Sequence, residues 1–82
     1  MTLEEYAHFL GKSLTEKEVD NGYICYFHNA HVQIGANQFC VIGRGNTRNE
    51  AKRDFAHKIS NETLVFNITE PDQEDVKVPE LR

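Results

Sequence analysis

Gly43-Arg44-Gly45-Asn46-Thr47-Arg48-Asn49-Glu50-Ala51-Lys52 is the most informative stretch of this chain. Its two glycines let the backbone turn sharply from a strand into a helix. The segment Thr47-Arg48-Asn49-Glu50 has the spacing of a capping box, in which the first and last residues accept hydrogen bonds from each other's backbone N–H. The stretch therefore predicts a tight turn followed directly by the start of a helix.

The helix that begins there has a clear apolar stripe. Ala51, Phe55 and Ile59 recur at four-residue steps, which is the spacing of one buried helix face. We expect this helix to run from Asn49 to about Leu64.

A second helix is expected at the start of the chain. Thr2-Leu3-Glu4-Glu5 is another capping box. Apolar side chains follow at i, i+3, i+4 and i+7, and Gly11 is a natural helix stop. The pattern predicts a helix from Thr2 to Leu10.

Three apolar, β-prone runs lie between the two helices, at residues 23–27, 31–34 and 39–42, and short turns separate them. The order is therefore α-β-β-β-α. The sequence predicts an α+β fold with a three-stranded antiparallel sheet and two helices packed on one face, which leaves the other face wet or open to a partner. We expect residues 1–66 to form this domain. Residues 67–82 contain both prolines and are acidic, so we expect a flexible tail.

The charge of the chain limits its function. The net charge is −4, and residues 67–82 hold 5 of the 13 acidic side chains and 2 of the 9 basic ones. Residues 1–66 are then close to neutral, which excludes a strongly basic nucleic-acid binder but not a local basic patch.

The sequence also indicates the cellular compartment of the protein. Cys25 and Cys40 lie in apolar runs and are expected to be buried free thiols, which suits a reducing compartment. No signal peptide and no apolar run of membrane-spanning length is visible. We therefore expect an intracellular protein, in the cytoplasm or the nucleus, with no membrane partner.

The sequence contains no recognisable pattern of catalytic or metal-ligating residues. We find no nucleophile–base pair and no paired carboxylates, so the sequence predicts a binding module, with no enzymatic activity, no catalytic residues and no cofactor. Cys25, His28, His31 and Cys40 are metal-ligand types. However, Cys25 and His28 would point to opposite faces of one strand, so no metal site is expected.

This order of elements, with two of its segments, resembles the double-stranded RNA-binding domain over roughly residues 2–66. Residues 3–8, Leu-Glu-Glu-Tyr-Ala-His, look like the family's first-helix pattern Leu-x-Glu-Tyr-x-Gln. Residues 43–52 look like its second pattern, Gly-x-Gly-x-Ser-Lys-Lys-x-Ala-Lys. The resemblance implies a module that binds duplex RNA by shape, independently of base sequence.

The resemblance also implies which residues touch RNA. Phosphates would be held at the start of the second helix, and ribose hydroxyls in the minor groove would be read from the first helix. The position of Arg48 and Lys52 in the first turns of the second helix itself suits phosphate, and Arg44 and Arg53 could add to that field. By resemblance, Asn49 also belongs to the RNA-binding set, and Glu5 and His8 occupy the positions that contact ribose. The same side chains also suit a solvated helix face, and Glu5 suits its capping box equally well.

Two departures from the family pattern predict weak binding. Asn49 stands where the family has the second of two adjacent lysines. The loop between the first two strands is short, whether strand 1 covers 22–28 or about 14–19, and it lacks the family's Gly-Pro-x-His element. The alternative is a module of the same fold that dimerises or docks on a protein through its sheet or first helix and binds little or no RNA.

Overall fold

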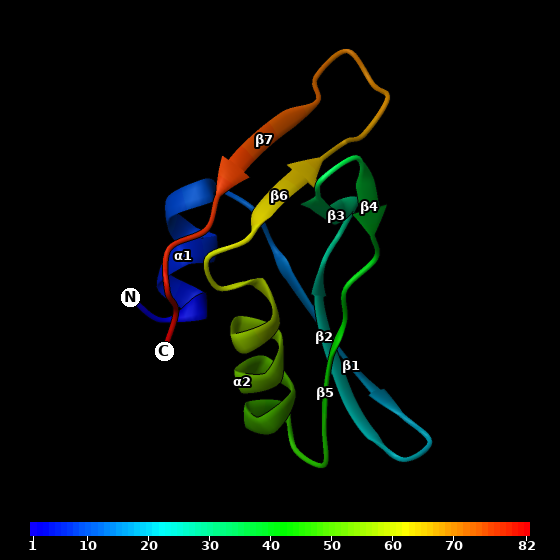
Figure 1. Cartoon of the computed structure of the whole chain (residues 1–82). Helices are drawn as coiled ribbons and strands as arrows, with labels where there is room; N and C mark the ends of the chain where they lie inside the picture. The colour runs from blue at the N-terminus through cyan, green and yellow to red at the C-terminus, as the bar shows by residue number, and fades with distance from the viewer.

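The computed structural model describes all 82 residues, and its first helix forms as the sequence predicts. Helix α1 covers Leu3–Leu10 (Figure 1). Thr2 Oγ1 accepts a hydrogen bond from the Glu5 N–H at 3.1 Å, and the Glu5 carboxylate accepts from the Thr2 N–H at 2.8 Å. Gly11 ends the helix with a φ of 69°, in the left-handed region that glycine adopts without strain. The first capping box is therefore confirmed.

Helix α2 covers Arg48–Ile59, and its predicted buried stripe is confirmed. Ala51, Phe55 and Ile59 are all buried. Thr47 caps the helix by accepting from the Glu50 N–H. The Glu50 carboxylate accepts from the Asn46 N–H instead of the Thr47 N–H, so only half of the second capping box forms.

The predicted end of this helix, near Leu64, is wrong. Ser60 leaves the helical conformation with a ψ of 131°. Strand β6, Thr63–Phe66, follows, and it pairs with β3. The apolar residues from Leu64 onward therefore contribute to the core from a strand. The apolar pattern alone did not distinguish a longer helix from a helix followed by a strand.

The strands form two antiparallel sheets, and the expected single sheet of three strands is wrong. The first sheet has the order β1 (Leu14–Val19), β2 (Gly22–Phe27), β5 (Gly43–Gly45). The second has the order β4 (Asn37–Phe39), β3 (Ala30–Ile34), β6, β7 (Glu74–Lys77). Strands β2 and β3 belong to different sheets and are not neighbours, and Asn29, with a left-handed φ of 53°, lies in the turn between them. The predicted run 39–42 overlaps only the end of β4.

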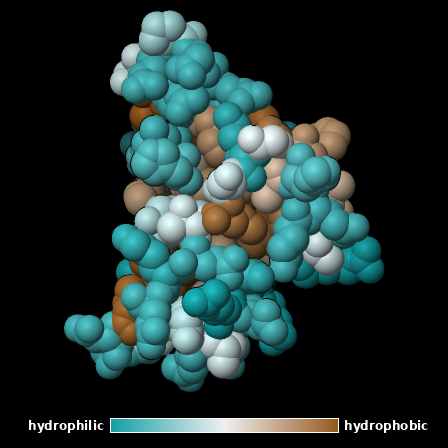
Figure 2. Space-filling model, turned by 180° about the vertical axis from the view of Figure 1, so that it is seen from behind, coloured by the Kyte–Doolittle hydropathy of each residue, from teal (hydrophilic) through white to brown (hydrophobic).

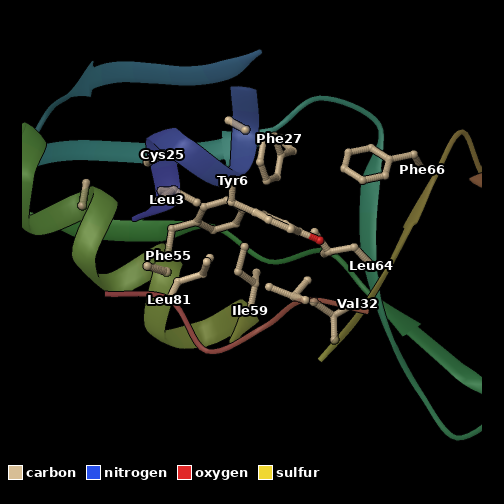
Figure 3. Close-up of a cluster of buried hydrophobic side chains, with 14 residues drawn as sticks. Leu3, Tyr6, Cys25, Phe27, Val32, Phe55, Ile59, Leu64, Phe66 and Leu81 are labelled. Atoms are coloured by element: carbon tan, nitrogen blue, oxygen red, sulfur yellow. The ribbon is translucent and has the colours of Figure 1, made fainter. Parts of the chain in front are cut away.

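Both helices lie on the same side of the first sheet (Figure 1). The core forms where they meet residues of both sheets, and Figure 3 shows these side chains converging. The Phe27 ring lies edge-on to the rings of Phe55 and Phe66, each at a centroid distance of 5.6 Å. These are favourable aromatic geometries, and they join β2, α2 and β6 in one core.

The C-terminal segment differs from the flexible tail that its prolines and acidic residues indicate. Strand β7 pairs with β6, and Val78 and Leu81 are buried in the core. The Leu81 N–H donates to Ser60 Oγ at 2.9 Å. All five acidic side chains of this segment are exposed, whereas its few apolar side chains point inward, and their burial favours an ordered segment.

Some apolar side chains remain outside the core. The large exposed ones are Met1, Phe9, Val19, Ile34 and Phe39. Seen from behind, the surface is mostly hydrophilic, with apolar atoms emerging near its middle and along part of one side (Figure 2). Cys25 is buried as expected, but Cys40 is exposed, so the expectation of two buried thiols is wrong for Cys40. No helix of the chain combines the length and the apolar character needed to cross a membrane.

Candidate nucleic-acid interface

The two glycines of β5 place this strand directly under the start of α2. A Cβ at Gly43 would collide with the Ala51 carbonyl oxygen and with Phe55, and a Cβ at Gly45 would collide with Glu50. Side chains alternate along a strand, so Arg44, between the glycines, points to the other side of the sheet. Only glycine permits this close approach, which brings the backbone of β5 beside the first turns of α2.

Three arginines lie on β5 or in the first turns of α2, and no carboxylate forms an ion pair with any of them. Arg44, Arg48 and Arg53 are exposed. The four ion pairs of the molecule are made by lysines: Lys12, Lys58 and, twice, Lys52. The Arg48 guanidinium lies over the Tyr23 ring, 5.6 Å from its centroid. Stacking of this kind orients the guanidinium and leaves its N–H groups free to donate.

Arg44 and Arg53 face one shallow hollow. Its lining is entirely polar or glycine: Arg44, Gly45, Asn46, Glu50, Arg53, Asp54 and His57. Arg53 also lines a second hollow, with Asn49, Lys52 and Arg82. The structure therefore divides the implied phosphate contacts between two hollows, and only Arg53 lines both. Arg48 points toward Tyr23, outside both hollows.

Lys52 is bound to acidic side chains. Its Nζ lies 3.3 Å from Glu4 Oε2 and 3.6 Å from Glu16 Oε1, so it joins α2 to α1 and β1. Partial burial lowers the pKa of Lys52, but the hydrogen bond to Glu4 and the charges of Glu4 and Glu16 outweigh it and leave the pKa raised. The Lys52 ammonium is charged and already paired with two carboxylates, so it is less available to bind a phosphate.

Asp54 organises the other side of the junction. Its Oδ2 accepts from the Arg44 N–H at 2.8 Å and lies 2.9 Å from Lys58 Nζ. Burial raises the pKa of Asp54, but these hydrogen bonds and the Lys58 charge outweigh that effect and leave the pKa lowered. Asp54 therefore holds β5 against α2 as a carboxylate and adds negative charge beside Arg44.

The implied ribose contacts lie apart from the arginines. Glu5 is occupied by its capping bonds to Thr2, which lower the pKa of its carboxyl. His8 is exposed on α1. Neither residue lines the hollows that contain Arg44 and Arg53. The structure therefore does not join them to the arginines in one concave site.

Sequence reasoning did not find four residues of this region. Tyr23 lies under Arg48, Asn46 lines the hollow with Arg44, Arg82 lies beside Arg53, and Glu16 binds Lys52. Glu16 and Arg82 are far from these partners in sequence, so only the fold brings them together.

No group of three or more His, Cys, Asp or Glu side chains is placed to hold a metal ion. Burial, with a contribution from the Glu16 charge, raises the pKa of the Cys25 thiol to about 11, so this thiol stays protonated at neutral pH.

No family model, no curated protein and no solved structure matches the chain.

Proposed function

We propose that this protein binds the phosphate backbone of double-stranded RNA, weakly and by duplex shape. The observation that carries the proposal is that three arginines are exposed and in no ion pair: Arg48 and Arg53 in the first turns of α2, and Arg44 on the adjacent strand β5. A guanidinium donates two parallel hydrogen bonds to a phosphate and stays charged at any physiological pH. The helix start adds free backbone N–H groups and a partial positive charge.

The arrangement of elements supports the likeness to the double-stranded RNA-binding domain. The first sheet is antiparallel and consists of the three strands β1, β2 and β5. Both helices, α1 and α2, lie on one side of it (Figure 1). Hairpin β3–β4 is then an insertion before the third strand of that unit, and β6–β7 is an addition after its last helix.

Binding is weak because several contacts of that family are lost here. Lys52 is neutralised by Glu4 and Glu16, and Glu5 is held by Thr2. The turn between β1 and β2 is only Asp20-Asn21, too short to reach a neighbouring groove. The arginines therefore supply most of the phosphate binding.

A titration tests the proposal. Fluorescence anisotropy with a labelled RNA duplex of about 16 base pairs is measured at about 50 mM and about 200 mM salt. We expect affinity to fall at the higher salt, since phosphate binding releases counterions. Arg48→Gln and Arg53→Gln should each weaken binding about fivefold, or about 1 kcal/mol per contact.

The matched control is Lys77→Gln, which removes the same charge from the exposed strand β7. It should leave affinity within about twofold of the unchanged protein. Absence of binding at low salt, or equal losses for Lys77→Gln and Arg48→Gln, would rule out a phosphate site at α2.

A second candidate function is protein interaction. The observation that favours it is a pair of exposed apolar side chains, Ile34 and Phe39, on hairpin β3–β4. This surface lies in the second sheet, whereas Arg44 and Arg48 belong to the first sheet and α2, so the two functions are separable by mutation.

A further inference from the structure

Arg82 is held in a fixed position at the surface. The preceding residue, Leu81, is buried, and its N–H donates to Ser60 Oγ at 2.9 Å. The Arg82 N–H donates to the Met1 carbonyl oxygen at 3.1 Å, so the two ends of the chain lie side by side next to α1 (Figure 1). The Arg82 side chain is exposed, but it extends from an anchored backbone.

Arg82 shares a small hollow with α2. The hollow is lined by Leu3, Glu4, Asn49, Lys52, Arg53 and Arg82. These residues come from three segments of the chain: the start of α1, the first two turns of α2 and the C-terminal segment. No local pattern in the sequence predicts this arrangement, because it depends on the packing of Leu81 into the core.

The hollow has an excess of positive charge. Three of its lining residues are basic and one, Glu4, is acidic. Lys52 is paired with Glu4, and Glu16 also contacts Lys52 from outside the hollow. Arg53 and Arg82 form no ion pair with any carboxylate. These two guanidinium groups therefore supply the charge that is not compensated.

Glu5 is the other carboxylate whose charge interacts with Arg82. The hydrogen bonds with Thr2 lower the pKa of Glu5 most, and the charge of Arg82 lowers it slightly further. However, the Glu5 carboxylate already accepts from the Thr2 N–H, and Glu5 does not line the hollow. Glu5 therefore weakens the positive field of Arg82 without neutralising it.

The size of the hollow limits the ligand that it can hold. Its volume is about 170 Å³, whereas sites that enclose a whole small molecule have about 300–1,000 Å³. At about 30 Å³ for each water of the liquid, the hollow has the space of five or six waters. One phosphate group fits this space, and its oxygens accept paired hydrogen bonds from a guanidinium.

We propose that this hollow binds one phosphate group, held between the guanidinium groups of Arg53 and Arg82. Two cations beside one small hollow repel each other, and an anion between them removes the repulsion and accepts hydrogen bonds from both. Asn49 lines the same hollow, and its side-chain amide can also donate. The proposal rests on the proposed function, because the expected source of the phosphate is the backbone of bound RNA.

Arg53 joins this site to the first one. It lines both this hollow and the hollow that contains Arg44. An RNA strand that contacts both hollows therefore crosses α2 at Arg53, and the binding surface extends from β5 to Arg82 beside α1. Arg82 then supplies a phosphate contact in place of Lys52, which is paired with carboxylates.

Arg82→Gln tests the site in the anisotropy titration with duplex RNA. We expect affinity to fall about fivefold, as for the loss of one contact to a charged group. Urea unfolding should be unchanged, because the Arg82 side chain is exposed and in no ion pair. The matched control is Lys77→Gln, which removes the same charge from β7 and should leave affinity within about twofold.

A double-mutant cycle tests whether the two arginines bind one phosphate. Two independent fivefold losses multiply to about twenty-fivefold, and Arg53→Gln with Arg82→Gln should lose less than that, since the first change already empties the site. Arg48→Gln with Arg82→Gln should give the full product, because Arg48 lies over Tyr23 and outside this hollow.

Inorganic phosphate separates this site from RNA binding. We expect NMR to show saturable shifts of the Arg53 and Arg82 side-chain N–H signals, which sodium chloride at equal ionic strength does not produce. If the protein binds RNA but Arg82→Gln weakens binding no more than Lys77→Gln, the proposal is wrong while the proposed function stands. If no RNA binds, the proposed function fails and the phosphate titration decides alone: shifts at both arginines support the site, and their absence overturns it.

Discussion

Lys52 Nζ lies 3.3 Å from Glu4 Oε2, so an ion pair between residues 48 apart in sequence joins α2 to α1. Glu16 completes the cluster from β1. The sequence pattern at the start of α2 predicts that Lys52 contacts phosphate, but in the structure Lys52 binds two carboxylates. In the folded protein, Lys52 connects elements of the fold, and in the proposed function the arginines would bind the phosphates.

Lys52→Met should therefore reduce stability more than RNA affinity. The ion pair is partly exposed, so we expect a loss of about 1 kcal/mol in the free energy of unfolding, measured with urea. RNA affinity should stay within about twofold. A double-mutant cycle with Glu4→Gln should show coupling between the two sites. If Lys52→Met reduced RNA affinity as much as Arg48→Gln and left stability unchanged, the prediction would be wrong, and Lys52 would be an RNA contact.

Gly43→Ala should destabilise the fold strongly, because its Cβ would collide with the backbone of α2. We expect a loss of about 3 kcal/mol, at the upper end for overpacking. Gly35→Ala is the control. Gly35 has a φ of 61° and open space around it, so alanine there costs only about 1 kcal/mol of backbone strain. Thermal unfolding that ranks the two variants in the reverse order would contradict the packing of β5 under α2.

Leu81→Ala should destabilise the protein although it lies next to the last residue. Leu81 is buried, and shortening a buried leucine costs about 2 kcal/mol or more. Glu80→Ala, at the exposed neighbouring position, should change stability by less than about 0.5 kcal/mol. Equal and small effects in urea unfolding would mean that the C-terminal segment does not hold the core.

The two thiols should react at different rates. Cys40 is exposed, whereas Cys25 is buried and burial raises its pKa to about 11. We expect a chromogenic disulfide reagent at pH 8 to modify one thiol quickly and the second only when the protein unfolds. Cys40→Ser should abolish the fast reaction. Fast modification of both thiols in the folded protein is the result that this arrangement does not allow.

Asp54 should make the protein sensitive to acid. Its pKa is lowered in the folded state, so its contribution is fully present above its unfolded pKa and is lost as pH falls through the folded value. Asp54→Asn should be less stable than the unchanged protein by about 1 kcal/mol at pH 7, since this carboxylate is only partly buried. The difference in melting temperature should disappear at the lowest pH. A difference that stays constant over the whole pH range would exclude this role.

The sequence predicted both helix starts, the buried stripe of α2 and the position of both helices on one side of a sheet. It did not predict the second sheet. The segment Leu14–Val19 was ambiguous because most of its residues are polar, and it forms a strand through pairing with β2. The segment after Phe66 was predicted to be flexible from its composition, yet three apolar residues, Val76, Val78 and Leu81, are enough to order it.

Local chemistry explains what could be derived from the residues alone. A capping threonine, a left-handed glycine and an apolar repeat act within a few residues, so their effect is the same in any context. Tertiary structure set the rest. Whether Lys52 meets Glu4 or a phosphate, and whether Arg82 lies beside Arg53, depend on groups brought together from distant parts of the chain, and those distances exist only once the core has packed.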